Sequence, residues 1–148
     1  MAVIKIISGG QTGIDQLALK VARELGIETG GVTPKGFLTE DGPAPWLADY
    51  GLIDDSSPNY PPRTRRNVVD SDATVWFGST DSSGFKLTKN CCVSAKKPFV
   101  ANPNAIELEN WIKNFQVNVL NVAGNRASKL SSVGKYQAQN ALTLALIN

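Results

Sequence analysis

The first 33 residues constrain the fold most strongly, because they place a glycine-rich turn between a strand pattern and a helix pattern. Residues 3–8 (VIKIIS) are rich in β-branched side chains, which predicts a buried strand that ends at Gly9 and Gly10. Apolar residues then recur at helical spacing over 14–25, which predicts an amphipathic helix. A second strand is predicted over 28–33, so the segment has the form of a βαβ crossover with parallel strands.

The ends of this first helix carry the usual start and stop signals. Thr12 and Asp15 have the T-x-x-D spacing of an N-cap residue and the third residue of a helix. Gly26 is placed to end the helix in a left-handed conformation.

The rest of the chain continues the alternation of strand and helix patterns. In the helix that begins at Arg63 we expect Val68 and Val69 to face the core and the arginines to face solvent. Such alternation predicts an α/β fold, with a mostly parallel sheet covered by helices on both faces, in one domain over residues 1–148. The expected strands are 73–77, 98–101 and 117–122, and the expected helices are 63–71, 85–94, 105–114 and 136–146.

Residues 34–62 interrupt this rhythm and contain six of the eight prolines. So long an irregular stretch in a compact domain is usually a lid or a binding loop, which is the functional interpretation. The alternative is a surface excursion without a role in binding.

Composition narrows the classes of function. The net charge of +2 does not favour nucleic-acid binding, and the absence of histidine excludes Ser–His catalysis and histidine-ligated zinc. Cys91 and Cys92 are adjacent, so they form no disulfide framework. We expect both to be packed helix residues, and the alternative is a role in binding a soft metal. No apolar run is long enough for a bilayer span and the N-terminus does not resemble a signal peptide, so a cytoplasmic location without membrane contact is expected.

Three predicted strands are each followed by a glycine-rich turn and then by a helix. The carboxyl ends of parallel strands meet at one edge of a sheet, which is where α/β proteins bind ligands. Glycines let the backbone approach a ligand, and the free N–H groups of a helix start attract a phosphate. We therefore predict a phosphate-bearing small molecule at this edge, bound by Gly9, Gly10, Gln11, Thr12, Gly13, Gly78, Ser79, Gly84, Thr88, Gly124, Arg126 and Ser128.

Further polar residues are candidates for additional contacts. Lys35 and Gly36 follow the second strand, and Arg63, Thr64 and Asn67 lie within one stretch of predicted helix. A lysine or arginine there could meet a phosphate, whereas the alternative for the arginines is a solvated basic face.

Three residues are candidates for catalysis: Arg63, Glu40 and Asp15. Glu40 is equally interpreted as a solvated loop charge, and Asp15 as a helix-capping residue. No set of side chains predicts a directly coordinated metal.

Several segments together resemble a known family. They are SGGQTGID (8–15), PKGFLTEDGP (34–43), the RT-x2-NV-x-DSDAT block (63–74), GFKLT (84–88), KP (97–98) and NVAGNRASK (121–129). They are similar to the molybdenum carrier family, a circularly permuted branch of the Rossmann-like SLOG superfamily that includes the lonely-guy nucleoside-phosphate hydrolases. The resemblance implies a Rossmann-like three-layer α/β/α fold, a homo-oligomer, and a pocket for molybdenum cofactor or a nucleotide, gripped through phosphate and ring.

The sequence departs from the hydrolase branch of that superfamily at one segment. Those enzymes carry an upstream arginine and a P-G-G-x-G-T-x-x-E motif. The arginines at 63, 65 and 66 match the first feature, but residues 78–84 lack the proline and paired glycines, and no glutamate follows Thr88 at the required spacing. Glu40 or Asp15 would have to replace that acid.

Three hypotheses follow. The first is a carrier or sensor that binds a phosphorylated pterin or nucleotide. The second is an enzyme that cleaves a nucleoside monophosphate into base and ribose phosphate. The third is an interaction module with a vestigial pocket, whose partner surface includes Trp46, Tyr50 and Tyr60.

Overall fold

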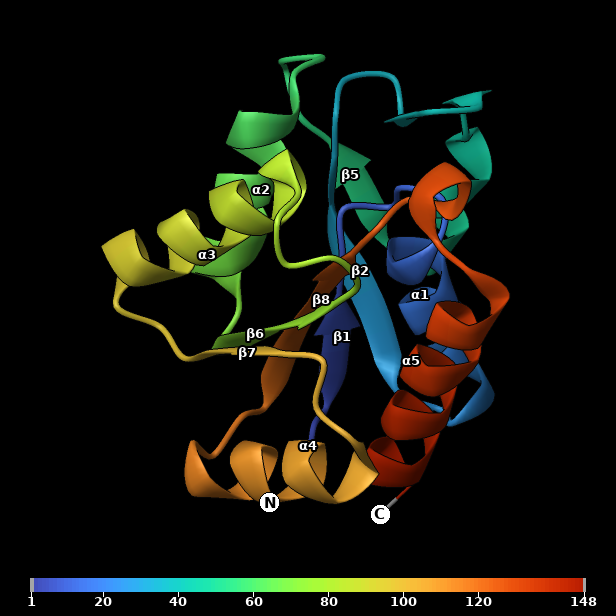
Figure 1. Cartoon of the computed structure of the whole chain (residues 1–148). Helices are drawn as coiled ribbons and strands as arrows, with labels where there is room; N and C mark the ends of the chain where they lie inside the picture. The colour runs from blue at the N-terminus through green and yellow to red at the C-terminus, as the bar shows by residue number, and fades with distance from the viewer. Residues whose placement is uncertain (1, 148) are drawn as a thin grey trace.

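A six-stranded, fully parallel sheet forms the centre of the computed structural model, which describes residues 2–147 (Figure 1). Its strand order is β5-β2-β1-β8-β6-β7, and every neighbouring pair runs parallel. The strands are β1 (Lys5–Ile7), β2 (Glu28–Thr33), β5 (Leu52–Asp54), β6 (Ala73–Phe77), β7 (Phe99–Ala101) and β8 (Val119–Gly124). This confirms the predicted α/β class and its parallel sheet.

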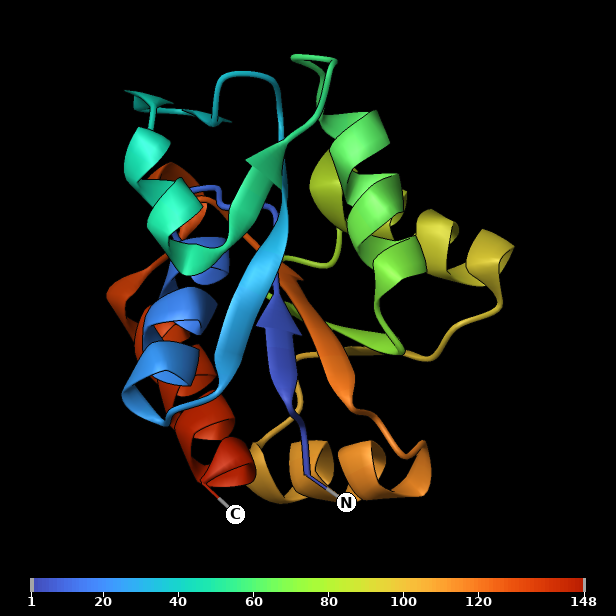
Figure 2. The same cartoon turned by 180° about the vertical axis from the view of Figure 1, so that it is seen from behind.

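Helices cover both faces of the sheet, which completes the three-layer arrangement. One face packs against α1 (Ile14–Glu24), α4 (Ala105–Asn114) and α5 (Ser132–Leu146), and the apolar core lies there. The other face carries α2 (Tyr60–Asp70) and α3 (Ser83–Ala95), which pack against each other. Figures 1 and 2 show the two helical layers from opposite sides. No helix within residues 2–147 is long and apolar enough to cross a membrane.

The path of the chain creates a crevice between β6 and β8. After β6 the chain enters α3 on one face, whereas after the adjacent β8 it enters α5 on the opposite face. Adjacent parallel strands whose connections leave to opposite faces open a crevice at their carboxyl ends, and this is the usual ligand position in open α/β sheets.

Residues 34–62 are ordered structure rather than an irregular loop. They form the hairpin β3–β4 (Leu38–Thr39 and Gly42–Pro43), the 3-10 helix η1 (Pro45–Tyr50) and the edge strand β5. Leu47 and Leu52 are buried in a small apolar cluster with Leu19 of α1. The segment therefore extends the sheet and packs against α1, so it is part of the fold. Its role in binding stays a prediction.

Several predicted boundaries shift. Helices α2, α3 and α5 begin earlier than predicted, at Tyr60, Ser83 and Ser132, and β8 is two residues later than predicted. Serine side chains explain two of these starts, because Ser82 and Ser131 accept hydrogen bonds from the N–H groups of residues three positions on.

Two local predictions were wrong. Gly13 holds the N-cap position of α1 and no side chain caps that helix, because the Thr12 hydroxyl bonds elsewhere. On α2, Val68 is buried as expected, but Val69 is 54% exposed and Arg63 turns inward. Gly26 ends α1 with a φ of 74°, as predicted.

Candidate functional site

A cleft of about 730 Å³ opens at the carboxyl ends of β6 and β8, on the sheet face covered by α2 and α3. It gathers residues from β6, β8, α2, α3 and the turns after β1 and β8. Its lining includes eight of the sequence-predicted ligand residues, together with Asp15: Gln11, Arg63, Thr64, Ser79, Gly84, Thr88, Gly124 and Arg126. The glycine-rich ends of three separate strands therefore do converge on one cleft.

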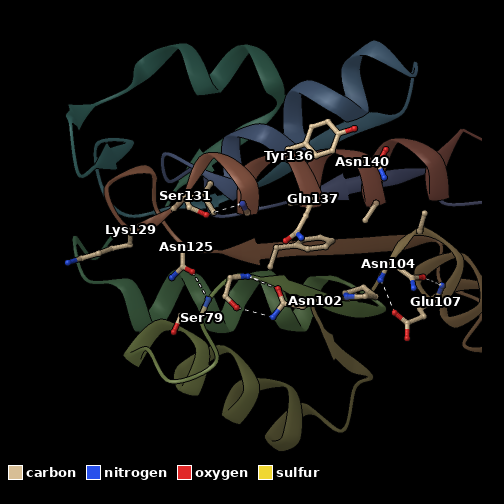
Figure 3. A pocket seen from close by; sticks show the side chains of 18 residues that line it. Ser79, Asn102, Asn104, Glu107, Asn125, Lys129, Ser131, Tyr136, Gln137 and Asn140 are labelled. Atoms are coloured by element: carbon tan, nitrogen blue, oxygen red, sulfur yellow. Dashed lines mark hydrogen bonds between the residues drawn. The ribbon is translucent and has the colours of Figure 1, made fainter.

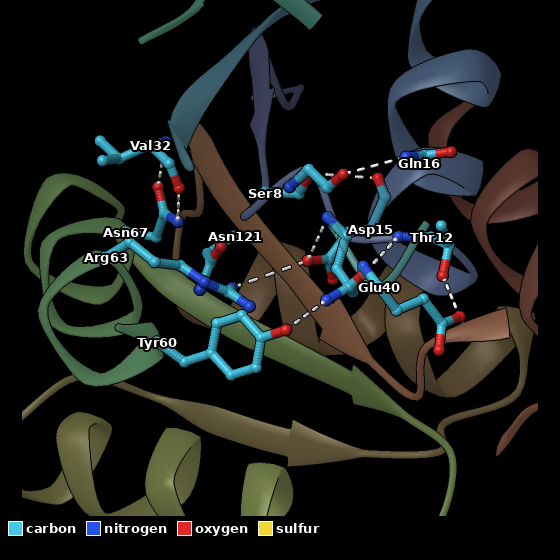
Figure 4. Close-up of polar contacts among 12 residues, drawn as sticks. Ser8, Thr12, Asp15, Gln16, Val32, Glu40, Tyr60, Arg63, Asn67 and Asn121 are labelled. Carbon is cyan, nitrogen blue, oxygen red and sulfur yellow. Dashed lines mark hydrogen bonds and ion pairs between the residues drawn. The ribbon is translucent and has the colours of Figure 1, made fainter. Parts of the chain in front are cut away.

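An ion pair forms the floor of this cleft. Arg63 Nη1 lies 3.7 Å from Asp15 Oδ2, and the two side chains are only 14% and 5% exposed. The carboxylate also accepts a hydrogen bond from the Gln11 N–H at 3.2 Å. Arg63 passes so close to Gly9 that a Cβ at that glycine would overlap the guanidinium, so Gly9 is what permits the pair. Figure 4 shows the arrangement.

The electrostatics of the floor favour a proton on Asp15. Burial raises the pKa of the Asp15 carboxyl from 3.8 to about 6, against the opposing effects of the Arg63 cation and of the Gln11 and Gly9 N–H groups. Arg63 Nε is buried without a hydrogen-bond partner among the described residues, so one donor of the guanidinium is left over. Buried donors are normally satisfied, so this one is an exception of the kind that catalytic roles or bound waters explain.

The opposite side of the cleft suits an anion. The first turn of α3 contributes Ser83 and Gly84, and Ser82 caps it by accepting a hydrogen bond from the Phe85 N–H at 3.1 Å. Arg126 and Lys129, which follow β8, also line the cleft. Free N–H groups at a helix start, a cation pair and hydroxyls are the usual components of a phosphate site.

The wall between these two regions is apolar and aromatic. Tyr60, Pro61, Trp76 and Leu87 line it. The Tyr60 hydroxyl accepts a hydrogen bond from Gln11 Nε2 at 3.1 Å, which ties the tyrosine to the turn after β1. A flat ring system would be covered by such a wall.

Glu40 does not line the cleft but fastens the β3–β4 hairpin to its rim. Its carboxylate accepts hydrogen bonds from Thr12 Oγ1 at 2.5 Å and from the Ser128 N–H at 3.1 Å, and Arg126 Nε lies 3.7 Å away. Hydrogen bonds from Ser128 and Thr12 hold the pKa of Glu40 below its usual 4.5. Glu40 is thus no solvated loop charge, and the hydroxyls of Thr12 and Ser128, predicted as ligand contacts, are occupied by an internal carboxylate.

The remaining predicted contacts lie outside the cleft. Asn67 is buried and exchanges two hydrogen bonds with the Val32 backbone, at 2.9 and 3.0 Å, so it joins α2 to β2. Gly13 has a φ of 83° and lies against the backbone of residues 125–127, where a side chain would not fit. Gly10, Lys35 and Gly36 lie against protein or in solvent. Gly78 lines a second cleft on the other face of the sheet.

Trp76, Asn125 and Lys129 are among the residues lining the cleft that sequence reasoning missed. Trp76 lies within an apolar strand pattern, and such a pattern does not distinguish a cleft residue from a core residue. Asn125 and Lys129 lie within the third glycine-rich turn, and the convergence of the turns was the signal that could have included them.

Of the aromatic residues in the third hypothesis, only Tyr60 lies at the cleft. Trp46 and Tyr50 stack edge-to-face at 5.8 Å, and the Arg23 guanidinium of α1 lies 3.6 Å from the Tyr50 ring centre. Trp46 remains 41% exposed.

Comparisons with known proteins agree with the geometry. The crystal structure of a protein described as a putative molybdenum carrier protein, from Syntrophus aciditrophicus SB, superposes with a TM-score of 0.84 at 35% identity, over 99% of this chain and 96% of that one. No curated protein matches significantly. The profile of the circularly permutated YpsA SLOG family matches residues 6–146. The chain therefore belongs to the circularly permuted YpsA branch of the SLOG family.

Proposed function

We propose that this protein binds a phosphorylated nucleotide-like or pterin-like small molecule in the α3-side cleft and acts as its carrier or sensor. The proposal rests mainly on the convergence of three strand ends on one cleft. One region of that cleft is polar and cationic, and another is apolar and aromatic. The phosphate would lie against the first turn of α3 with Arg126 and Lys129, and the ring system against Tyr60 and Trp76.

The solved relative is described as a putative molybdenum carrier, and molybdenum cofactor is one cargo of that kind. This cleft offers a phosphate site and an aromatic wall, which are the contacts that the pterin part of such a cargo requires. Within residues 2–147, no three His, Cys, Asp or Glu side chains cluster so as to hold a metal ion. We therefore propose that the protein contacts the phosphate and the ring system of its ligand.

Calorimetric titration tests the proposal. AMP, GMP, CMP, UMP and inorganic phosphate are titrated into the protein, and at least one mononucleotide is expected to bind and to raise the melting temperature. Lys129→Gln should weaken that binding about tenfold, because a charge-assisted contact is lost. The matched control is Lys96→Gln, at the opposite end of α3, which should leave the affinity unchanged. Absence of binding, or equal effects of both variants, would contradict the proposal.

A second candidate function is N-glycosidic hydrolysis, and the Asp15–Arg63 pair favours it. A buried carboxyl with a pKa of about 6 exchanges protons near neutral pH, and it lies beside an arginine in the same cleft. Release of free base from a nucleoside monophosphate, lost in Asp15→Asn but retained in Asp41→Asn, is the expected result. If no base is released from any of the four mononucleotides, the carrier function stands alone.

A further inference from the structure

A second cleft, of about 590 Å³, opens on the other face of the sheet, between the start of α4 and the exposed side of α5 (Figure 3). Two of the sequence-predicted ligand residues, Gly78 and Ser79, line it. Ser79, Asn125 and Lys129 line this cleft and the first one, so the two clefts meet at a shared ridge. The ridge lies where the connections after two adjacent strands leave to opposite faces of the sheet. Ser79 comes after β6, and Asn125 comes after the neighbouring β8.

Hydrogen bonds hold the ridge together. The Ser79 N–H donates to Asn125 Oδ1 at 2.6 Å, and the Asn125 N–H donates to the Phe77 carbonyl at 3.2 Å. Asn102 accepts from the Gly78 N–H at 2.8 Å and donates to its carbonyl at 2.9 Å, which braces the ridge from β7. A side chain at Gly78 would overlap Asn125, so the close approach of the two turns depends on that glycine.

Two donors on the ridge have no protein partner among the described residues. The Asn125 side-chain nitrogen donates no hydrogen bond, and the Lys129 ammonium forms no ion pair within residues 2–147. Lys129 is exposed and its side chain extends away from Asn125 in Figure 3, so it would have to swing back to meet a ligand on the ridge. A neutral amide donor and a lysine at a crevice between parallel strands are suited to phosphate oxygens.

The second cleft differs in chemistry from the first. Its walls carry neutral hydrogen-bonding side chains, including Gln137 and Asn140 of α5, and the ring of Tyr136. Its single lining carboxylate, Glu107, already accepts a hydrogen bond from the Asn104 N–H at 2.9 Å. Apart from Lys129 on the ridge, no lining residue is cationic, so this cleft suits an uncharged sugar or base rather than another phosphate.

We infer that the two clefts form one composite site for a dinucleotide-like ligand, in which two nucleoside-like groups are joined by bridging phosphates. The phosphates lie over Ser79, Asn125 and Lys129, one ring-bearing group occupies the α3-side cleft, and the other lies against Tyr136, Gln137 and Asn140. This inference rests on the proposed function and narrows it from phosphorylated small molecules in general to two-part ligands.

The composite site predicts that a two-part ligand binds more tightly than either of its halves. Once one half is bound, the other half is held near its own cleft, so the two binding energies reinforce each other. Calorimetry with the four mononucleotides, the corresponding symmetric dinucleoside diphosphates and ADP-ribose should therefore show a two-part compound binding at least tenfold more tightly than its best mononucleotide half.

Variants of the second cleft separate this inference from the proposed function. Gln137→Ala and Asn140→Trp should each weaken the two-part ligand at least fivefold and leave mononucleotide binding unchanged. Gln139→Ala is the matched control, because Gln139 is an exposed glutamine of the same helix that does not line the cleft. Its affinity for both ligand classes should equal that of the parent.

Each outcome decides something. If mononucleotides bind but two-part ligands bind no more tightly, or if Gln137→Ala behaves like Gln139→Ala, the composite site is wrong and the proposed function stands. If no compound of the panel binds, both fall. A crystal structure with the tightest ligand would contradict the inference if Tyr136, Gln137 and Asn140 made no contact with it.

Discussion

The two faces of the sheet are built from the same strands but with opposite chemistry. Along β8, Leu120 and Val122 point into the apolar core beneath α1 and α5, whereas the intervening Asn121 points to the other face and donates to Thr74 at 3.1 Å. The same alternation along β6 sends Val75 to the core and Trp76 to the cleft.

This difference indicates which side chains stabilise the fold and which side chains bind a mononucleotide. The face under α1, α4 and α5 buries aliphatic side chains in one continuous cluster. The face under α2 and α3 buries polar groups that mostly satisfy one another, and it leaves a cleft with an ion pair at its floor. Substitutions in the buried aliphatic cluster of the first face should therefore change the free energy of unfolding, and those in the α3-side cleft should change mononucleotide affinity.

The largest expected effect is the loss of stability when a side chain in the apolar core is truncated. Leu142 of α5 is fully buried, so Leu142→Ala should lower the free energy of unfolding by about 2–5 kcal/mol in urea titrations. Leu87→Ala makes the same truncation at a half-buried position of the cleft and should cost about 1 kcal/mol. Leu87→Ala should weaken ligand binding more than Leu142→Ala does. If Leu87→Ala is the more destabilising, the division between the faces is wrong.

A smaller effect is expected at the floor of the cleft. Arg63→Ala leaves Asp15 buried without its cation, which should cost about 2 kcal/mol near neutral pH and raise the pKa of Asp15 above 6. The cost should shrink as the pH falls, because the neutral acid needs no cation. Urea titrations from pH 4 to pH 8 measure it.

The sign of the pH dependence follows from Asp15 in the parent protein. Its pKa in the folded state is above the usual 3.8, so its contribution to stability is fully present below pH 3.8 and is lost as the pH rises through about 6. Carbon NMR of the Asp15 carboxyl should give its midpoint directly, near 6. Arg65→Ala, on the exposed side of α2, serves as the control and should leave this midpoint unchanged.

The smallest effect concerns the hairpin at the rim. Glu40→Gln removes the charge that Thr12, Ser128 and Arg126 hold, and it should cost about 1 kcal/mol. The pKa of Glu40 lies below 4.5, so its stabilisation is present above pH 4.5 and is lost as the pH falls through the lower, folded-state value. Faster amide exchange in the hairpin would report the loosening. Asp41→Asn, in the same turn but exposed, should change neither quantity.

Much of the fold could be predicted from the sequence, because apolar strand runs alternate with helical patterns and are separated by glycines and prolines. The strand 73–77 and the helix 105–114 have the predicted bounds. Strand β5 was missed because three residues, Leu52–Asp54, show no period of their own and acquire their structure by pairing with β2.

The candidate site was harder to predict, because its contacts join distant segments. Nothing local indicates that Arg63 turns toward Asp15, since periodicity treats an arginine as a surface residue. The contact of Glu40 with Thr12 and Ser128 likewise depends on the hairpin folding back over two turns. Homo-oligomerisation and the cytoplasmic location stay predictions.

An amide chemical-shift titration with the tightest-binding mononucleotide tests most directly whether the polar face is the binding face. We expect the shifts to cluster in residues 79–84 and 124–129, with the Arg63 guanidinium signal moving as well. Shifts confined to the outer side of α1, or spread evenly over the molecule, would contradict the account.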